Sequence, residues 1–297
     1  MDIENLRAAG AIAAKIKGQV GKLAMEGESY LDIAETIEQM IREAGAEPAF
    51  PVNLGMNEVS AHDTPEYKDT RNLEAGLLKV DFGVKYKDGL VDTAVTIDLT
   101  GEHQDMIDAA NSALKVAIDS IKEGVSVGDV GSKVEDCIKE AGFKPISNLT
   151  GHMISDGTLH AGIEVPNIAN SIPYQFKEGD VFALEPFVTT GKGTVNDRDV
   201  VEIFSLDNPA PVRSRAARMV IIHVAEAYHQ LPFAERWLIN KFNSKLLVSA
   251  ALRELLERGI LKGYPVLVED KGALVAQSEA TVVVKKDRVE VLTGPVA

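Results

Sequence analysis

The chain has 297 residues, of which 31 are Lys or Arg and 45 are Asp or Glu, so its formal net charge is −14. This acidic balance argues against a surface built mainly to bind nucleic acid phosphates or anionic lipid. A hydrophobic fraction of 45% is typical of a soluble globular protein, and the single cysteine excludes an internal disulfide. We therefore expect a cytoplasmic protein with one domain over residues 1–297, with no secretory signal and no membrane-spanning segment.

Residues 3–45 have the apolar spacing of two consecutive helices. Residues 103–142 show the same pattern. In each segment a glycine marks the break and a second glycine, 18 residues later, marks the stop (Gly27 and Gly45, Gly124 and Gly142). The repeated spacing predicts two matching helix pairs.

Each predicted helix pair is followed by an irregular segment with a histidine and then by a strand with an acidic residue. The first half has His62 and then Asp81 in LLKVDFGV, and the second has His152 and then Glu185 in VFALEPFV. A helix pair, a loop histidine and a strand acid recurring in the same order indicate an internal duplication. We expect an α+β fold of two halves related by a pseudo-twofold axis.

A tight turn is predicted at Lys87–Gly89, because the Asp-Gly pair lies between two apolar-alternating segments. The resulting hairpin would place Asp81 and Asp92 opposite one another. Both carboxylates are expected to point away from the most apolar face of the hairpin.

The region from about 207 to 264 interrupts the duplication with a run of helical patterns. It predicts a helical subdomain inserted between strand segments. The chain then returns to a β-branched segment, LVAQSEATVVV, which carries Glu279.

Five side chains recur at matching places of the two halves: Asp81, Asp92, His152, Glu185 and Glu279. A single acid on a strand is usually solvated, but the pseudo-twofold axis would bring these five together. Four carboxylates cannot be buried together without cations, because each unpaired ion costs several kcal/mol. The joint pattern therefore predicts a site for two divalent metal ions.

The segments VDFGVKYKDGLVDTAV, NLTGH, LHAG, ALEPF and AQSEATVVV resemble the metal-binding motifs of methionine aminopeptidases, and the resemblance covers nearly the whole chain. It implies a pita-bread fold, in which two pseudo-symmetric halves surround a central curved antiparallel sheet. The helical insert between Glu185 and Glu279 resembles that of the type II subfamily, in its archaeal form.

The same resemblance implies the metal ligands. Asp81 would bind one ion, Asp92 and Glu279 would bridge both ions or chelate, and His152 and Glu185 would complete the coordination shell of the second ion. This set of hard oxygen ligands with one imidazole suits Co, Mn, Fe or Zn, and the sequence does not choose among them.

The resemblance also implies the activity, which is removal of the N-terminal methionine from nascent polypeptides with a preference for a small second residue. Glu185 would accept a proton from a metal-bridging water, His160 would steady the oxyanion and His62 would line the substrate cleft. The ribosome is a further candidate partner. The methionine pocket would be formed by Phe50, Leu159 and Tyr264, beside His62 and His160.

Three positions depart from the family pattern: Asp63 replaces a tyrosine, Met153 a glycine and Ala280 a histidine. They leave all five ligands in place but affect the polarity of the cleft and the orientation of its ligands.

Two alternatives share the fold, a non-catalytic binding or scaffold protein and a proline-specific aminopeptidase or dipeptidase. A third is a winged-helix-like DNA-binding module within the insert. It is disfavoured because glutamates alternate there with the basic residues, as on a solvated helical face.

Overall fold

The computed structural model describes residues 1–296, and most of its elements fall into two similar halves. The first half contains α1 (Ile3–Leu23), α2 (Tyr30–Glu43), β1 (Glu47–Pro48), β2 (Asn53–Met56), β3 (Val59–Ala61), β4 (Leu77–Tyr86) and β5 (Gly89–Asp98). The second contains α3 (Gln104–Ser120), α4 (Val127–Glu140), β6 (Lys144–Pro145), β7 (Thr150–Ile154), β8 (Glu164–Pro166), β9 (Val181–Leu184), β10 (Phe187–Thr189), β14 (Val275–Gln277), β15 (Ala280–Val284) and β16 (Val289–Val291).

The two helix pairs begin and end for the same local reasons. Ser29 and Ser126 are the N-caps of α2 and α4, and each hydroxyl accepts a hydrogen bond from the backbone three residues on. Gly27 and Gly124 precede these caps with φ values of 89° and 83°, which glycine adopts at little cost. The duplication of the helix pairs predicted from the sequence is confirmed.

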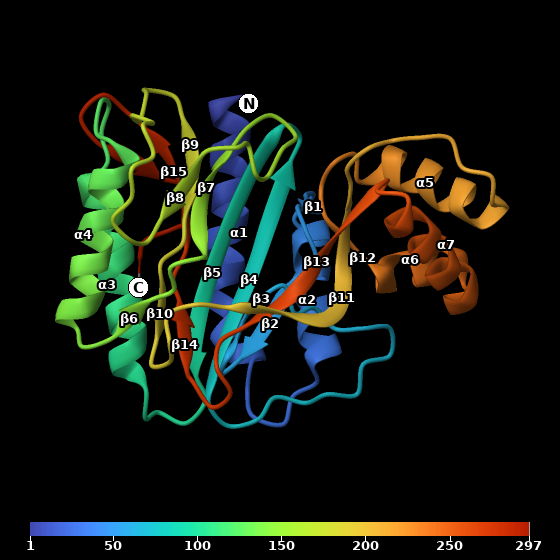
Figure 1. Ribbon diagram of the computed structural model, residues 1–297, viewed down its shortest axis with the longest axis horizontal. Helices are drawn as coiled ribbons and strands as arrows, with labels where there is room; N and C mark the ends of the chain where they lie inside the picture. The colour runs from blue at the N-terminus through green and yellow to red at the C-terminus, as the bar shows by residue number, and fades with distance from the viewer. Residues whose placement is uncertain (297) are drawn as a thin grey trace.

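The strands repeat as well. In the first half β4 pairs with β5, β1 and β2, and in the second half β9 pairs with β7 and β15 while β10 pairs with β6 and β14. Helix α1 packs along β4 and β5, and helices α3 and α4 cover β10, β14, β6 and β8 (Figure 1). The sheets of the two halves therefore meet between two layers of helices.

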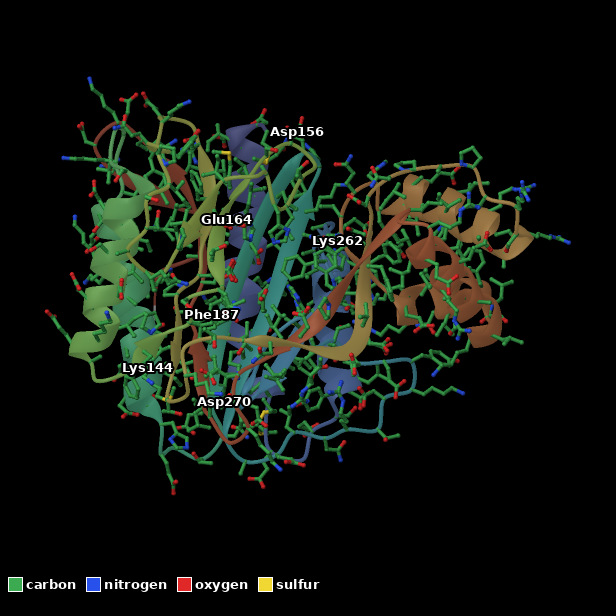
Figure 2. The ribbon with its side chains drawn as sticks, viewed as in Figure 1. Lys144, Asp156, Glu164, Phe187, Lys262 and Asp270 are labelled. Carbon is green, nitrogen blue, oxygen red and sulfur yellow. The ribbon has the colours of Figure 1, made fainter. Side chains whose placement is uncertain are left out.

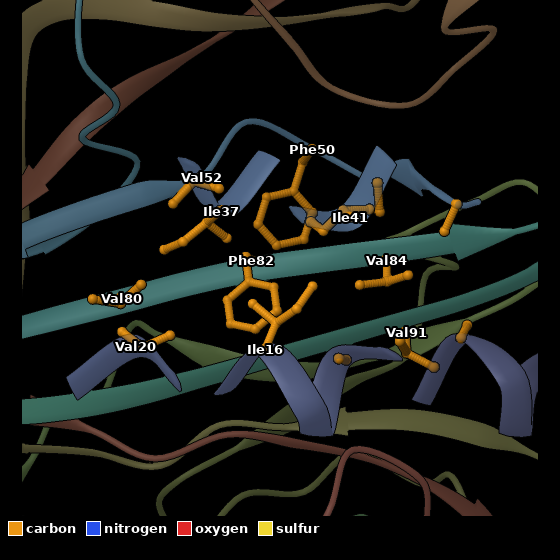
Figure 3. Close-up of a cluster of buried hydrophobic side chains, with 14 of the residues drawn as sticks. Ile16, Val20, Ile37, Ile41, Phe50, Val52, Val80, Phe82, Val84 and Val91 are labelled. Carbon is orange, nitrogen blue, oxygen red and sulfur yellow. The ribbon is translucent and has the colours of Figure 1, made fainter. Parts of the chain in front are cut away.

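Strand β4 separates a core face from an inner face. Val80, Phe82 and Val84 are fully buried and pack against Ile16 and Val20 of α1 (Figure 3). Each of these side chains contributes about 1.5–3 kcal/mol through burial. Because side chains alternate along a strand, this packing directs the odd-numbered positions of β4 toward the other half.

The turn between β4 and β5 differs from the prediction. Lys87 and Asp88 form the two-residue loop, with Lys87 at φ 55°, whereas Gly89 already belongs to β5. A Cβ atom at Gly89 would lie 2.4 Å from the backbone carbonyl of Asn5. The glycine is therefore required by the close approach of α1 and not by the turn itself.

The register of the hairpin corrects a second expectation. Asp81 pairs with Ala94, and Asp92 pairs with Gly83. The two carboxylates thus lie on the same face but are offset by two residues instead of standing directly opposite. Such diagonal neighbours remain within reach of one another.

Two segments expected as continuous strands are each interrupted at a glutamate. VFALEPFV divides into β9 and β10 around Glu185, and VAQSEATVVV divides into β14 and β15 around Glu279. The ladder between β9 and β15 ends where Leu184 pairs with Ala280, and the ladder between β10 and β14 continues beyond the break. The two glutamates therefore face each other across a shared gap in the sheet.

Strands β11 (Asn196–Leu206) and β13 (Leu261–Val268) form an antiparallel ribbon that leads to the helical insert. The insert contains α5 (Arg215–Ala227), β12 (Phe233–Ala234), α6 (Glu235–Phe242) and α7 (Lys245–Glu257), which share a hydrophobic cluster of their own. These helices lie to one side of the two halves (Figure 1). The end of the range expected to be helical, 261–264, belongs to β13. No helix in residues 1–296 is long and apolar enough to cross a bilayer.

Candidate metal centre and active site

All ten residues singled out in the sequence line one cavity of about 200 Å³. They come from both halves and from the ribbon that carries the insert: Phe50, His62, Asp81, Asp92, His152, Leu159, His160, Glu185, Tyr264 and Glu279. Phe187 of β10 lines the cavity and lies on one side of the β4–β5 hairpin in Figure 2. Lys262 lies on the other side, on the same strand as the lining residue Tyr264.

Three buried side chains form the centre of this cavity. One ligand atom from each of Asp92, His152 and Glu279 lies within 4.8 Å of the other two. The His152 Nε2 atom is 3.4 Å from Asp92 Oδ2 and 3.5 Å from Glu185 Oε1. This compact group of carboxylates around an imidazole has the size of a metal coordination shell.

Several of these atoms have no hydrogen-bond partner among the described residues. They are the Oδ1 atoms of Asp81 and Asp92 and the Nδ1 atom of His152, all of them buried. An unpaired buried polar atom costs about 1–3 kcal/mol. Carboxylate oxygens and an imidazole are ligands for first-row divalent cations. The residues therefore fit a divalent metal ion, which would offset the cost of burying these unpaired atoms.

The carboxyl groups are strongly perturbed. Burial raises the pKa values of Asp81, Glu185 and Glu279 well above their ordinary range, and the nearby charge of Asp92 raises them further. A cation among them would act in the opposite direction and favour the ionised forms.

Burial lowers the pKa values of the two other histidines of the cavity, which favours their neutral forms. The His160 ring centroid is 4.3 Å from that of His152, and burial, assisted by the charge of His152, lowers the pKa of His160 to about 3. Burial also lowers the pKa of His62. The His62 Nδ1 atom lies 3.1 Å from the carbonyl oxygen of Pro265, and the ring meets Tyr264 edge-on at 5.5 Å. Each neutral ring can donate one hydrogen bond.

Three supporting residues were not predicted. Gln277 Nε2 donates to Asp81 Oδ2 at 3.3 Å and to Glu279 Oε2 at 3.4 Å. Lys17 Nζ and Thr93 Oγ1 donate to the backbone oxygen of Glu279 at 3.0 and 2.9 Å. The sequence held two indications of these contacts. Gln277 lies two residues before Glu279, so an extended segment would place both side chains on the same face. Lys17 lies among the apolar residues of the first helix, where a charged side chain needs a partner.

Residues 4–205, more than half of the chain, match the sequence model of metallopeptidase family M24. The chain belongs to this family. It is 45% identical over 295 residues to the methionine aminopeptidase of Pyrococcus abyssi, covering 99% of this chain and 100% of that protein. It is 36% identical over 293 residues to that of Methanocaldococcus jannaschii, covering 98% of each. These alignments run through the helical insert and place the chain among the methionine aminopeptidases of the family.

Solved structures support the fold at much lower identity. A thermophilic Arx1 matches with a TM-score of 0.86 and 16% identity, covering 99% of this chain and 91% of that one. The methionine aminopeptidase of Thermotoga maritima matches with a TM-score of 0.71 and 19% identity, covering 98% and 96%. The prolidase of Pyrococcus furiosus matches with a TM-score of 0.62 and 17% identity, covering 98% of this chain and 63% of that one. The pita-bread fold expected from the sequence is thereby confirmed.

The three departures from the family pattern leave the cavity residues in place. Asp63 is buried and forms an ion pair with Arg71. Met153 packs, partly buried, against the core of the second half, and Ala280 begins β15 beside Glu279. None of the three lines the cavity.

Proposed function

We propose that this chain is a metal-dependent aminopeptidase that removes the N-terminal methionine from nascent polypeptides in the cytoplasm and prefers a small second residue. The observation that carries the proposal is the convergence of the predicted ligands, with their unpaired buried atoms, in one cavity of an M24 metallopeptidase. The names of the relatives at 36–45% identity support the same activity.

The proposed centre holds two divalent ions, drawn from Co, Mn, Fe and Zn. Asp81 would help to hold one ion, and Asp92 and Glu279 would contribute to the binding of both. His152 and Glu185 would complete the coordination shell of the second ion. The 3.5 Å between His152 Nε2 and Glu185 Oε1 supports a common ion for these two side chains.

Divalent ions bound here would supply Lewis acidity and lower the pKa of water near the scissile carbonyl. Glu185 is placed to accept the proton, because its carboxylate lies at the edge of the cluster within the cavity. His160 is neutral above its pKa of about 3, so its ring N–H can donate a hydrogen bond to the substrate carbonyl oxygen without adding charge. His62 lines the cleft, and because its Nδ1–H faces the Pro265 carbonyl oxygen, its Nε2 would be free to accept a hydrogen bond from the substrate.

Phe50, Leu159 and Tyr264 would form the methionine pocket. All three border the cavity, and Phe50 and Leu159 are buried apolar side chains. The cavity volume of about 200 Å³ is below the roughly 300–1,000 Å³ of sites for drug-sized ligands. Such a small cavity suits the side chain of a single residue.

The ribosome is part of the proposal as a docking partner. Apart from Arg236, which is buried against Glu38, residues 207–260 contain seven Arg or Lys against five Asp or Glu, although the whole chain has a net charge of −14. This small local excess of positive charge, interspersed with glutamates, is what supports contact with a polyanionic surface. Salt-sensitive co-sedimentation with ribosomes would support this docking, and its absence at low salt would contradict it.

The activity is tested on metal-stripped protein with a Met-Ala-Ser peptide, adding Co, Mn, Fe or Zn in turn. Free methionine should appear only after metal is added. The Asp92→Ala variant should be inactive with every metal, whereas Asp119→Ala, which changes an exposed aspartate on α3, should behave as wild type. Folded protein that releases no methionine with any metal would overturn the proposal.

The alternatives make different predictions in the same assay. A proline-specific enzyme would cleave Xaa-Pro peptides and leave Met-Ala-Ser intact. A scaffold protein would cleave neither peptide, even though it binds metal.

A further inference from the structure

His62 has an unusual backbone conformation for a residue that lines the cavity. Its φ value is 64°, in the left-handed region that costs a non-glycine residue about 1–2 kcal/mol. Such a conformation persists only where the surrounding contacts hold it. The bend directs the ring toward Tyr264 and the carbonyl oxygen of Pro265.

Asp63, the next residue, is held at both its backbone and its side chain. Its carbonyl oxygen accepts a hydrogen bond from the backbone of Leu54 at 2.7 Å. Its carboxylate accepts two bonds from the Arg71 guanidinium, at 2.8 and 3.0 Å. Two parallel bonds between a guanidinium and a carboxylate fix both distance and angle.

Arg71 is itself fixed in place. Its guanidinium also donates to Asp69 Oδ2 at 2.8 Å and lies 4.6 Å from the centre of the Tyr30 ring. Among residues 1–296, Asp63 forms its ion pair with Arg71. Arg71 thus links Asp63 to Tyr30 at the start of α2.

The chain beyond Asp63 is anchored by a second arginine. Thr64 Oγ1 donates to the backbone oxygen of Val52 at 2.7 Å and accepts a bond from Arg236 Nη1 at 2.6 Å. Arg236 also donates to the Pro65 oxygen at 3.2 Å. With Thr64 and Pro65 fixed, the orientation of His62 depends on how Asp63 is held.

We propose that Arg71 is a positioning residue for His62: its ion pair with Asp63 holds the left-handed bend that directs the His62 ring into the cavity. The inference rests on the proposed function, in which His62 contacts the substrate. It also gives a reason for Asp63 at a position where the family pattern has a tyrosine, since only a carboxylate can form this pair with Arg71.

The test compares Arg71→Gln with Arg7→Gln. Both arginines have side chains that are 46% exposed and both pair with two carboxylates, but Arg7 pairs with Glu4 and Glu290, outside the cavity. With Met-Ala-Ser, Arg71→Gln should lower kcat/KM about five- to twentyfold, and Arg7→Gln should change it less than twofold. Arg71→Lys should recover only part of the loss, because an ammonium cannot form the two-pronged contact.

A double-mutant cycle separates positioning from general stability. In a His62→Ala background, Arg71→Gln should change kcat/KM less than twofold, because the ring that it positions is absent. An equal loss in both backgrounds would overturn the proposal. If Arg71→Gln does not fold, Asp63→Asn breaks the same pair from the other side, and the same outcomes apply to it.

The imidazole NMR signals provide a readout that does not depend on activity. Arg71→Gln should shift the His62 signal, assigned by its loss in His62→Ala, and Arg7→Gln should leave it in place. If wild-type protein shows no peptidase activity, the proposed function fails and the His62 signal alone decides the positioning role. An unmoved His62 signal in folded Arg71→Gln protein would overturn that role.

Discussion

The ammonium group of Lys17, on α1, lies 3.0 Å from the backbone oxygen of Glu279, 262 residues further along the chain. The Thr93 hydroxyl donates to the same oxygen at 2.9 Å. Lys17 is largely buried, and burial lowers its pKa to about 8. The Lys17 side chain, from the first helix of the chain, therefore contacts the backbone of Glu279, a proposed metal ligand near the C-terminus.

Lys17→Met should tighten the binding of divalent metal about three- to tenfold, because a positive charge close to the ligands opposes the entry of a cation and each factor of ten corresponds to about 1.4 kcal/mol. The Glu279 carbonyl keeps its bond from Thr93, so its position should be retained. Isothermal titration of metal-stripped protein measures the effect. Lys15→Met, at an exposed position of the same helix, is the control. Weaker binding by Lys17→Met would show that its hydrogen bonds matter more than its charge.

The metal-free protein should lose stability as the pH rises above about 4, the ordinary pKa range of carboxyl groups. The pKa values of Asp81, Glu185 and Glu279 are raised by burial, so the folded state holds protons that the unfolded state has already released. Over that window the unfolded state binds fewer protons, so the free energy of unfolding falls with pH. Melting temperatures in a chelator at pH 5 and pH 7.5 test this, and added divalent metal should reverse the order.

Glu279→Gln should stabilise the metal-free protein at pH 7.5 by about 1–2 kcal/mol, because it removes one of several buried like charges. At about 2–4 °C per kcal/mol for a protein of this size, the melting temperature should rise measurably. The same variant should gain less stability than wild type when metal is added. A variant less stable than wild type in chelator would contradict this account of the cluster.

His160→Ala should lower kcat for methionine release about 10²-fold, since removing one donor to a developing oxyanion typically costs 10²–10³. Because the pKa of His160 is about 3, its protonation should not shape the pH–rate profile above pH 5. Steady-state kinetics with Met-Ala-Ser check both statements. His229→Ala, outside the residues that line the cavity, should retain wild-type rates.

Gly83→Ala should raise KM for methionine peptides and destabilise the protein by about 1–3 kcal/mol through overpacking. A Cβ atom at this position would lie 2.5 Å from Phe50 Cε1 and 2.8 Å from Ala49 Cβ, so the wall of the cavity must move. Gly18→Ala in α1 is the matched control. It meets nothing within 4 Å and should stabilise the helix by about 0.5–1 kcal/mol. Thermal melts and peptide kinetics on both variants decide the point.

The sequence predicted the helix pairs correctly because their ends depend on residues that are neighbours in the chain. The matching helix pairs follow from serine caps and positive-φ glycines that act within a few residues. The hairpin was predicted, but the role of Gly89 was misassigned because its requirement comes from the backbone of Asn5, which lies far away in the chain. The interruption of the strands at Glu185 and Glu279 was missed for a different reason, because alternating apolar residues look alike in a continuous strand and in a broken one.

The sequence by itself determined the duplication, the strand faces and the residue types of the candidate site, because periodicity, caps and motif spacing depend on neighbours in the chain. Only the tertiary structure decided that ten of these residues share one cavity, that Lys17 and Gln277 contact the Glu279 ligand segment, and that Arg71 holds Asp63 beside His62. These contacts join segments from different halves or loops. They depend on how the two sheets dock and on where burial leaves polar atoms unpaired, and neither property has a period that can be read along the chain.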